Sequence, residues 1–499
     1  MTIGKLLLLA AALLPAGAWA QLEVDATQVV ANPTNAPAPL HPVPSERQLL
    51  WNETEFYAFF HYGMNTYTGQ EWGDGSESES TFAPTKTPNP EQWLTAAKAA
   101  GMKGGIAVVK HHDGFCLWPT ATTTHSTAGA SGYGRDVNIP QLFASAAQKL
   151  GMKYGFYISP WDRNSRLYGT QEYIDQVFIP QCEELAGYGS DQFEMWFDGA
   201  NGGSGYYGGK NTTISIGSNY IDRVLYYDVA NLRNRIHQLA PNCVVWGVGG
   251  EARWIGNEDG YAGETNWSTD SRNDENNNGQ GTEDYWLWNP GEADAKATSG
   301  GWFWHQGESV SSAEELFKIY MQSVGRNATL ILNIPPDRSG ELPTATVNRM
   351  TELGNLLQTR LGTNLAESVT ATATRSGGSY DAANLIDGDK DTYWATDDGT
   401  TTASVTIDLG SQKTARYVML QEYIRLGQRV KGFSIQYSTD GNSWRTASSQ
   451  ESMTTIGHKR IIPLNGSVSG LPSGYQARYI KVNITSSKAC PVLHTVAVY

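Results

Sequence analysis

The sequence predicts an α/β chain in two parts, a (β/α)8-like barrel followed by an all-β sandwich, and three observations support this prediction. Short apolar strand candidates alternate with helical patterns before residue 340, and the early candidates end about 40 to 50 residues apart, which is typical of a parallel sheet. The first strand candidate is not followed by a Gly-rich nucleotide fingerprint, which favours a barrel over an open sheet. After Gly362, short alternating segments separated by Gly, Asn, Asp and Ser predict a sandwich.

Seven strand candidates and three helical patterns make up the predicted barrel. The strands are Glu55–His61, Gly104–His111, Lys153–Ser159, Gln192–Asp198, Asn242–Gly247, Gly301–His305 and Thr329–Ile334. The helices are Pro90–Ala100, Ile139–Leu150 and Ile221–Leu239. An eighth strand has no evident place between about 250 and 300, where the segment SRNDENNNGQG predicts a long loop.

The two predicted domains follow an N-terminal targeting segment. Met1–Ala20 contains one positive residue, Lys5, an apolar run too short for a membrane helix, and small residues at 18 and 20, all typical of a signal peptide cleaved after Ala20. An uncleaved anchor is the alternative. Residues 21–44 are a Pro/Ala-rich lead-in, residues 45–362 the barrel and residues 366–499 the sandwich. We therefore expect an exported protein, periplasmic or extracellular, without a membrane span.

Composition excludes several classes of function. A net charge of −14 and a pI of about 5.1, with no basic run, argue against nucleic-acid binding. The chain has 53 Gly, 16 Trp and 25 Tyr but only 17% charged residues, which suits a loop-rich protein that binds neutral, hydroxyl-bearing ligands. Its 4 cysteines are far apart and predict neither a zinc site nor a disulfide framework; we expect them to be small buried apolar residues.

Polar and aromatic residues gather where the predicted barrel strands end. In a (β/α) barrel these ends form the active-site rim, so the side chains there are the first candidates for chemistry. The strand-end motifs are His61, Lys110-His111-His112-Asp113, Ser159-Pro160-Trp161-Asp162, Trp196-Phe197-Asp198-Gly199 and Trp302-Phe303-Trp304-His305. Indoles stack on sugar rings, imidazoles and carboxylates bind hydroxyls, and a pair of carboxylates is what glycoside hydrolysis requires.

The fourth strand candidate separates interior from exterior side chains. Alternation turns Glu194, Trp196 and Asp198 into the barrel and the apolar set Phe193, Met195 and Phe197 toward the helices. Glu194 lies deep, so we expect a core ion pair, with Lys110 as its partner, rather than a catalytic role. Asp198 lies at the mouth, and the Gly-rich segment that follows it lets a ligand approach closely.

These motifs resemble the α-L-fucosidases of glycoside hydrolase family 29, in the branch associated with α-1,3/1,4-linked fucose. The motifs are HYGMNT from His61, EWG from Glu71, KHHDGF from Lys110, SPWDRN from Ser159, WFDGA from Trp196 and VGRN from Val324, and they span about 46 to 345. The resemblance implies an exo-acting retaining glycosidase in which Asp198 is the nucleophile. It also implies that fucose is bound by His61, Glu71, His111, His112, Tyr157, Trp196 and Trp302.

The acid/base residue is open among four loop carboxylates, Glu251, Glu258, Glu264 and Glu292. The segment RWIGNEDG is similar to the one that holds the acid/base in the family, which favours Glu258. The segment from Gly291 to Trp302 departs from the family sequence, which puts a role for Glu292 in doubt. In the implied double displacement, Asp198 attacks the anomeric carbon while Glu258 protonates the leaving oxygen, and the two carboxyl groups lie about 5 Å apart.

Other functions remain open at this stage. A metal at His111 and His112 is disfavoured, because adjacent strand residues point to opposite faces and no recognised spacing is present, so we expect no cofactor for catalysis. A sugar-binding protein without strong catalysis is one alternative, and a barrel glycosidase for another sugar, such as a galactoside, is a second. The natural glycan and the oligomeric state are undetermined.

The predicted sandwich resembles discoidin-type modules, including family 32 carbohydrate-binding modules. The motifs are NLIDGDKDTYW from Asn384, FSIQYSTDG from Phe433 and RYIKV from Arg478. Many such modules hold structural calcium, which here implies Asp387, Asp389 and Thr392 as ligands. The final segment from His494 lacks the acidic residue typical at that point. Packing on the barrel and independent sugar binding are both open roles for the module.

Overall fold

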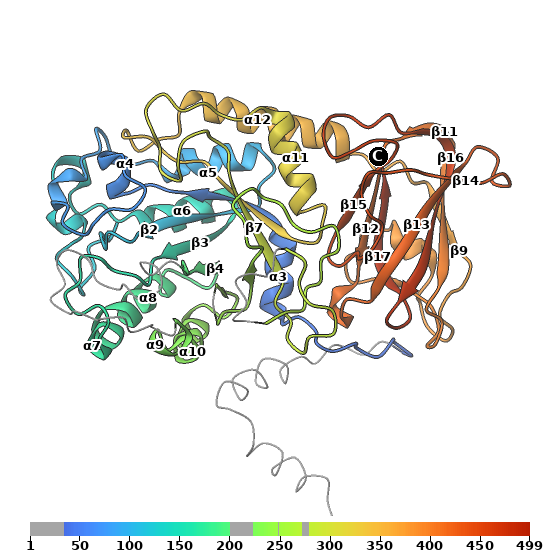
Figure 1. Ribbon diagram of the computed structural model, residues 1–499, viewed down its shortest axis with the longest axis horizontal. Coiled ribbons are helices and arrows are strands. Elements are labelled where there is room, and N and C mark those ends of the chain that lie inside the picture. The colour runs from blue at the N-terminus through green and yellow to red at the C-terminus, as the bar shows by residue number, and fades with distance from the viewer. Residues whose placement is uncertain (1–33, 200–222, 248, 272–278) are drawn as a thin grey trace, which may run out of the picture.

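The computed structural model describes residues 34–199, 223–247, 249–271 and 279–499, and it consists of two lobes side by side (Figure 1). The signal peptide prediction, most of the lead-in and the Gly-rich segment after Asp198 lie outside the described residues. The first lobe is an α/β barrel and the second is built from antiparallel sheets. Within the described ranges, no helix has both the length and the apolar character that a membrane crossing requires.

Eight parallel strands form a nearly closed barrel. They are β1 (Phe56–Phe60), β2 (Gly104–Lys110), β3 (Lys153–Ile158), β4 (Gln192–Trp196), β5 (Val244–Trp246), β6 (Arg253–Trp254), β7 (Gly291–Lys296) and β8 (Thr329–Asn333). The sheet order is β5-β4-β3-β2-β1-β8-β7-β6, and a parallel bridge between Trp246 and Ala252 joins its two ends. The predicted barrel is therefore confirmed.

Two strands of the barrel escaped sequence analysis, and one predicted strand is wrong. Gly301–His305 is a loop, whereas β6 and β7 occupy the interval that appeared to be loop only. The strand β7, with the sequence GEADAK, carries charged side chains at every second position, and five of its six residues are buried. A strand that turns polar side chains inward lacks the apolar signature by which its neighbours were recognised.

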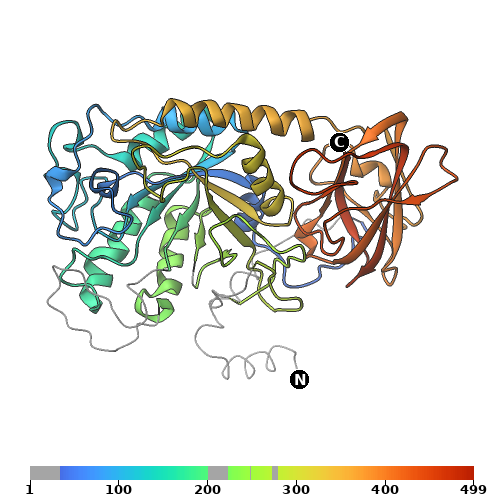
Figure 2. The ribbon, with the colours of Figure 1, turned by 45° about the horizontal axis from the view of Figure 1, so that its top comes forward.

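Helices cover the outside of the barrel (Figures 1 and 2). The described helices are α3 (Glu46–Thr54), α4 (Met64–Thr68), α5 (Pro90–Ala99), α6 (Ile139–Leu150), α7 (Gln171–Tyr173), α8 (Ile179–Ala186), α9 (Arg223–Tyr226), α10 (Val229–Leu239), α11 (Ala313–Ser323) and α12 (Thr344–Leu361). The helix predicted over 221–239 is broken, because Asp228 adopts a left-handed conformation with φ of 48°. Helix α5 begins where the Asn89 side chain accepts the Gln92 N–H and Pro90 occupies the first turn.

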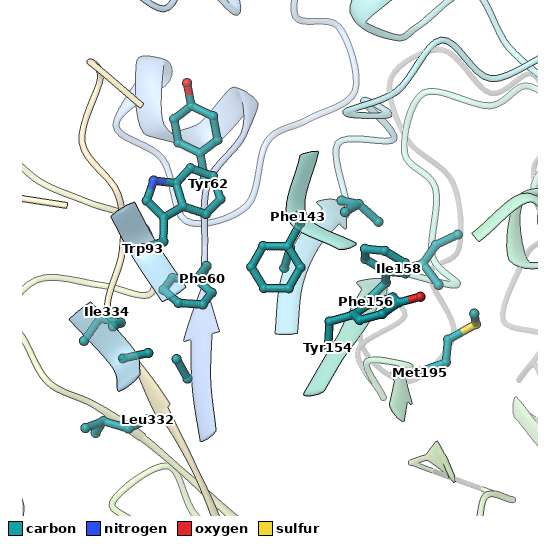
Figure 3. Packing of buried hydrophobic residues seen from close by; sticks show 14 of the residues in the cluster. Phe60, Tyr62, Trp93, Phe143, Tyr154, Phe156, Ile158, Met195, Leu332 and Ile334 are labelled. Atoms are coloured by element: carbon teal, nitrogen blue, oxygen red, sulfur yellow. The ribbon is translucent and has the colours of Figure 1, made fainter. Parts of the chain in front are cut away.

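Large side chains fill the layer between strands and helices. Figure 3 shows Phe60 of β1 beside Trp93 of α5 and Phe143 of α6; the centroid of the Phe60 ring lies 5.7 and 5.6 Å from theirs, and those two are 6.5 Å apart. All three rings are buried. Fully burying one such aromatic side chain stabilises a fold by roughly 1.5–3 kcal/mol, so this layer holds the barrel and its helices together.

Strand β4 follows the predicted alternation only in part. Met195 and Phe197 belong to the apolar layer under the helices, as predicted, but Phe193 packs inside the barrel, 5.0 Å from the ring of Tyr57. The register of β4 against β3 shifts between Gln192 and Glu194, and such an irregularity turns a side chain to the other face.

The predicted ion pair between Glu194 and Lys110 is wrong. The Lys110 Nζ lies 2.9 Å from the Asp162 Oδ2 and donates hydrogen bonds of 3.0 Å to the Tyr173 hydroxyl and the Gln181 side chain. The register of β2 shifts near its end, between Val108 and Lys110, and this turns Lys110 toward the outer layer.

The second lobe is a two-sheet sandwich. One sheet has the order β10 (Trp394–Ala395), β17 (Val492–Val498), β12 (Tyr417–Glu422) and β15 (Arg460–Pro463). The other has the order β14 (Arg445–Thr446), β13 (Val430–Ser438), β16 (Tyr475–Ser487), β11 (Ala403–Ala415) and β9 (Ser368–Ala371). The alternating sequence pattern predicted this arrangement, because each strand turns alternate apolar side chains into one core. All 4 cysteines are free and buried, also as predicted.

Buried charges join the two lobes. Arg326, just before β8, makes a two-pronged contact with Glu451 of the sandwich at 2.7 and 2.9 Å, and Arg460 of β15 donates to the same carboxylate at 3.1 Å. The three residues are at most 7% exposed. Removing one member of such a buried cluster would leave an uncompensated charge, so the cluster specifies a single docking geometry.

Candidate active site

The parallel strands of the barrel bring the predicted binding residues to one rim. His61 follows β1, His111 and His112 follow β2, Tyr157 lies near the end of β3, and Trp196 ends β4. Contacts between their rings link all five: the centroids of His61 and His111 are 6.0 Å apart, and those of Tyr157 and Trp196 are 5.2 Å apart. The rim is therefore a single constellation, as the barrel topology requires.

Stacked aromatic rings form one wall of the site. The indole of Trp196 stacks on that of Trp246 at 3.8 Å, and its other neighbour is the ring of Tyr157. On the opposite side, Trp302 lies 5.1 Å from the ring of His61. Trp246 and Tyr157 cover the two faces of the Trp196 indole, which is 6% exposed and presents only an edge to the site, whereas Trp302 is half-buried and offers more of its ring.

Asp198 lies at the mouth of the barrel, two residues beyond the end of β4. Its Oδ2 accepts a 2.9 Å hydrogen bond from the Tyr157 hydroxyl and lies 3.7 Å from the Nε2 of His112. The side chain is 26% exposed, so it is held in place and is open to a ligand from one side. A carboxylate in this position is suited to attack a bound sugar.

The hydrogen-bond network assigns a tautomer to two of the three imidazoles. Asn333 donates to the Trp302 carbonyl, so its Oδ1 accepts from the Nδ1–H of His61 at 2.8 Å. Ser159 donates to the Trp161 carbonyl and accepts from the Nδ1–H of His112 at 2.7 Å. Both rings therefore keep Nε2 as an acceptor.

The tautomer of the third imidazole, His111, is not fixed in this way. Its Nδ1 lies 3.4 Å from the Asn65 amide nitrogen, whose two hydrogens have closer acceptors at 3.2 Å in the Glu71 carbonyl and the Asp113 Oδ2. In either tautomer the neutral ring has one donor and one acceptor nitrogen.

Burial keeps these imidazoles neutral. It lowers the pKa of His61 to about 3 and that of His112 to about 4, the latter against the opposing charge of Asp198. Burial also lowers the pKa of His111 well below its usual value, and the nearby His112 and His61 add to this effect. A neutral imidazole both donates and accepts hydrogen bonds, which a polyhydroxylated ligand requires.

The prediction that His111 and His112 point to opposite faces is wrong. Strand β2 ends at Lys110, so strand alternation no longer applies beyond it, and the two ring centroids lie 4.2 Å apart. Together with Asp198 they bring three potential ligand atoms within 4.8 Å of one another. This donor set could hold a metal ion, and it equally suits the hydroxyl groups of a sugar.

Glu71 reaches the rim from the loop after α4. Its Oε2 accepts the Trp302 N–H at 2.7 Å, and its Oε1 lies 2.7 Å from the Nε2 of His305. A Cβ at 301 would lie 1.8 Å from the Glu71 Oε1, so any residue other than glycine there would displace the Glu71 carboxylate from this position. Glu71 thereby ties the loop 301–305 to the site, which explains why Trp302 lies on the rim although no strand precedes it directly.

The four candidate acid/base carboxylates have different environments. Glu258, in the loop after β6, is 50% exposed, lies 3.4 Å from the Lys296 Nζ and is close to the Trp302 side of the site. Glu251 is buried between Arg47 and His237, whose hydrogen bond lowers the carboxyl pKa to about 2 against the effect of burial. Glu264 accepts the Ser452 N–H at the sandwich.

Glu292 is the fourth candidate and is enclosed in the barrel interior. It is fully buried, and its Oε1 accepts the Trp196 indole N–H at 2.7 Å. Of the four, Glu258 alone combines exposure with a place beside the rim.

Sequence analysis missed several residues of this site. Asn333 at the end of β8 orients His61, Trp246 at the end of β5 stacks on Trp196, and Lys296 ends β7 with its Nζ 5.1 Å from the Trp302 ring. Asn333 and Trp246 ended recognised strands and could have been found by inspecting every strand end. Lys296 could not, because β7 itself went unrecognised.

Comparison with known proteins agrees with this geometry. A family model described as alpha-L-fucosidase matches residues 42–360. The chain belongs to the α-L-fucosidase family. A second model, the F5/8 type C domain, matches residues 368–494, so the sandwich is a discoidin-like domain. The fucosidase thus combines a glycoside hydrolase family 29 barrel with a C-terminal discoidin-like lobe.

Relatives and solved structures show how far the likeness extends. Alpha-L-fucosidase 1 of Arabidopsis thaliana is 30% identical over 93% of this chain and 88% of its own length. A glycoside hydrolase 29 fucosidase of Ruminococcus gnavus, solved in complex with fucose, is 31% identical with a TM-score of 0.79, covering 93% of this chain and 97% of that one. A glycoside hydrolase 29 member from a rumen bacterium is 35% identical with a TM-score of 0.77, covering 92% and 78%.

We predict that His61 and His112 make stability depend on pH. Their folded pKa values lie below the usual value of 6.5, so the unfolded chain binds more protons and their contribution, present above pH 6.5, is lost as pH falls toward about 4. The effect reaches at most about 1.4 kcal/mol per pH unit for each ring. Melting temperatures of wild type and His61→Gln/His112→Gln measure it: the wild-type value falls more steeply on acidification. His41→Gln, at an exposed histidine, is the control and should keep the wild-type dependence of melting temperature on pH. Equal dependence for wild type and the double variant would refute the prediction.

Proposed function

We propose that this α-L-fucosidase is exo-acting and retaining, with Asp198 as its nucleophile. The observation that carries the proposal is the position of Asp198, whose Oδ2 accepts from the Tyr157 hydroxyl at 2.9 Å while the side chain stays 26% exposed. The chain belongs to the α-L-fucosidase family, and Asp198 is the third residue of its WFDGA motif. A rigidly oriented carboxylate at an open mouth is the arrangement that nucleophilic attack needs.

Glu258 is the proposed acid/base. Of the four candidate carboxylates, three are committed to structural contacts, whereas Glu258 is half-exposed beside Lys296 and Trp302. In the first step Asp198 bonds to the anomeric carbon while Glu258 gives its proton to the leaving oxygen. In the second step Glu258 takes a proton from water, and that water displaces Asp198, so the anomeric configuration is retained. Retention of the anomeric configuration requires the carboxyl groups of Asp198 and Glu258 to lie about 5 Å apart during the reaction.

The remaining predicted residues are proposed to bind fucose. The acceptor nitrogens of His61 and His112 and the neutral ring of His111 match sugar hydroxyl groups, which both donate and accept hydrogen bonds. Glu71 adds a carboxylate oxygen, Trp302 supplies aromatic surface, and Tyr157 and Trp196 form the stacked wall behind the sugar. No step of this mechanism requires a cofactor.

We expect Asp198→Ala to lower kcat on a nitrophenyl fucoside more than about a thousandfold while L-fucose still binds. Glu258→Ala should lose about 100- to 10,000-fold on substrates with a poor leaving group. Azide identifies each role: it should give a fucosyl azide of inverted configuration with the Asp198 variant and of retained configuration with the Glu258 variant. Glu264→Gln is the matched control, and near-normal hydrolysis by Asp198→Ala would disprove the assignment.

The proposed substrates are glycans with terminal α-1,3/1,4-linked fucose. The support is the resemblance of the barrel motifs to that branch of the family. Hydrolysis of Lewis-type trisaccharides should therefore exceed that of 2′-fucosyllactose at equal concentration. Sugar release followed by chromatography measures both, and equal rates would rule out the linkage preference.

The discoidin-like lobe is proposed to act as a support for the barrel and to hold structural calcium. Three oxygen atoms converge in its loop: the Thr392 hydroxyl donates to the Asp387 Oδ2 at 2.7 Å and to the Asp389 carbonyl at 3.1 Å. Oxygen atoms in this arrangement suit Ca²⁺. The final segment from His494 lacks the acidic residue typical of such modules at that point, so we expect a weak site.

If calcium stabilises this loop, a chelator should lower the melting temperature and added Ca²⁺ should restore it. Asp387→Asn should remove the response, whereas Asp440→Asn, at a distant turn of the same lobe, should leave it intact. An unchanged melting temperature in chelator would exclude the site.

Export to the periplasm or the medium is also proposed, on the strength of the N-terminal sequence alone.

A further inference from the structure

Two carboxyl groups meet in the middle of the barrel, beneath the proposed sugar site. Glu194 comes from β4 and Glu292 from β7, strands that are not neighbours in the sheet, and both side chains are fully buried. The two carboxyl groups lie close enough for each to influence the ionisation of the other. The proposed hydrolysis uses neither of them. Burying two carboxyl groups is costly, so their retention needs a physical explanation.

Glu292 accepts more hydrogen bonds from surrounding groups than Glu194 does. Glu292 accepts from the Trp196 indole N–H at 2.7 Å through Oε1 and from the Tyr57 hydroxyl through Oε2. Glu194 accepts from the Trp51 indole N–H at 3.0 Å through Oε2. Among the described residues, no N–H or O–H group donates to the buried Oε1 of Glu194. A proton on that oxygen, donated to Glu292, satisfies both carboxyl groups.

The electrostatics of the interior agree with one shared proton. Burial raises the pKa of both carboxyl groups, and the charge of Glu292 raises that of Glu194 further. Three other titratable groups face the pair: Tyr57, Cys243 and Asp294. Burial raises the pKa of Tyr57 and Cys243 well above their usual values, so both stay neutral. The pKa of Asp294, whose Oδ1 accepts from Trp254 at 2.7 Å, is also raised by burial.

Trp196 connects this pair to the rim. Its ring is held on one side by Trp246 at 3.8 Å and on the other by Tyr157 at 5.2 Å, and Tyr157 in turn bonds to Asp198. Stacking alone permits an indole to slide or turn in its plane. The hydrogen bond from its N–H to Glu292 removes that freedom.

We propose that Glu194 and Glu292 form a proton-sharing carboxyl pair that fixes the indole of Trp196 and so positions the fucose-binding wall. The inference rests on the proposed function, because it takes Trp196 as a sugar contact. Loss of the shared proton leaves two adjacent buried carboxylates whose repulsion displaces Glu292 from Trp196. Glu194 and Glu292 are positioning residues, and fucose affinity depends on the protonation of their pair.

The test measures L-fucose binding by calorimetry between about pH 5.5 and 9 in a Glu258→Gln background, where the proposed acid/base cannot titrate. In the Glu258→Gln protein, the parent for the other variants, the Kd for L-fucose should rise about tenfold or more as pH increases. Adding Glu194→Gln should make the Kd independent of pH, because its amide N–H replaces the shared proton and cannot be lost.

Variants of Glu292 test the link to Trp196. Glu292→Leu leaves the buried indole N–H without its acceptor and should weaken binding about tenfold or more at every pH. Glu292→Gln restores an acceptor and should recover most of that loss. Glu422→Gln is the matched control, since Glu422 is a buried carboxyl of the sandwich whose pKa burial raises to about 7. It should leave the pH dependence of the parent unchanged.

Several outcomes would overturn the proposal: a Kd of the Glu258→Gln parent that does not change with pH, the same pH dependence after Glu194→Gln, unimpaired binding by Glu292→Leu, or a pH dependence of the Kd that Asp294→Asn abolishes instead.

If the folded Glu258→Gln parent binds no fucose, the proposed function fails, and thermal unfolding then tests the carboxyl pair alone. Since the folded pKa of Glu194 is raised, its contribution to stability is present at low pH and lost as pH rises. The melting temperature of wild type should therefore fall relative to Glu194→Gln with rising pH, and a constant difference refutes the pair.

Discussion

The parallel hydrogen-bonded register of the barrel is the constraint on which the site depends. Because all eight strands run the same way, their carboxyl ends meet at one rim, and side chains more than 250 residues apart in the chain come into contact. The hydrogen bond between His61 after β1 and Asn333 at the end of β8 is the clearest example. Local register shifts change which face a side chain occupies: Lys110 points to the outer layer and Phe193 to the barrel interior.

Depth in the barrel sets the state of each ionisable group. Near the mouth, Asp198 and Glu258 are partly exposed and lie beside other polar groups, which suits residues that exchange charge with a substrate. Deeper in, burial keeps the imidazoles neutral, and at the bottom it leaves the pair of Glu194 and Glu292 to share a proton. One gradient of burial thus provides an accessible carboxyl group, proposed as the nucleophile, neutral hydrogen-bonding groups and a rigid support within a single barrel.

The sandwich contributes to the shape of the barrel through buried polar contacts. Asn266, in the loop that follows Glu258, donates its N–H to Thr455 and accepts from Gln428, and its side chain binds the backbone before β8. Together with the cluster around Glu451, these bonds hold the segment around Asn266 and the residues before β8 against the second lobe. The discoidin-like lobe is therefore part of the architecture that holds the Glu258 loop.

Much of this protein is determined by local sequence. Short apolar runs revealed most barrel strands, and alternating segments revealed the sandwich. The strand-end motifs located His61, His111, Trp196 and Asp198, because a residue's place along a strand determines the rim it reaches. Tertiary structure alone decided the rest. Strand β7 could not be recognised from the sequence, because its alternate side chains are charged and their interaction partners lie on other parts of the barrel. The sequence suggested Lys110 as the partner of Glu194, whereas the folded barrel places Glu292 beside Glu194 and Lys110 beside Asp162. The partner of a buried carboxyl group depends on which distant strand faces it.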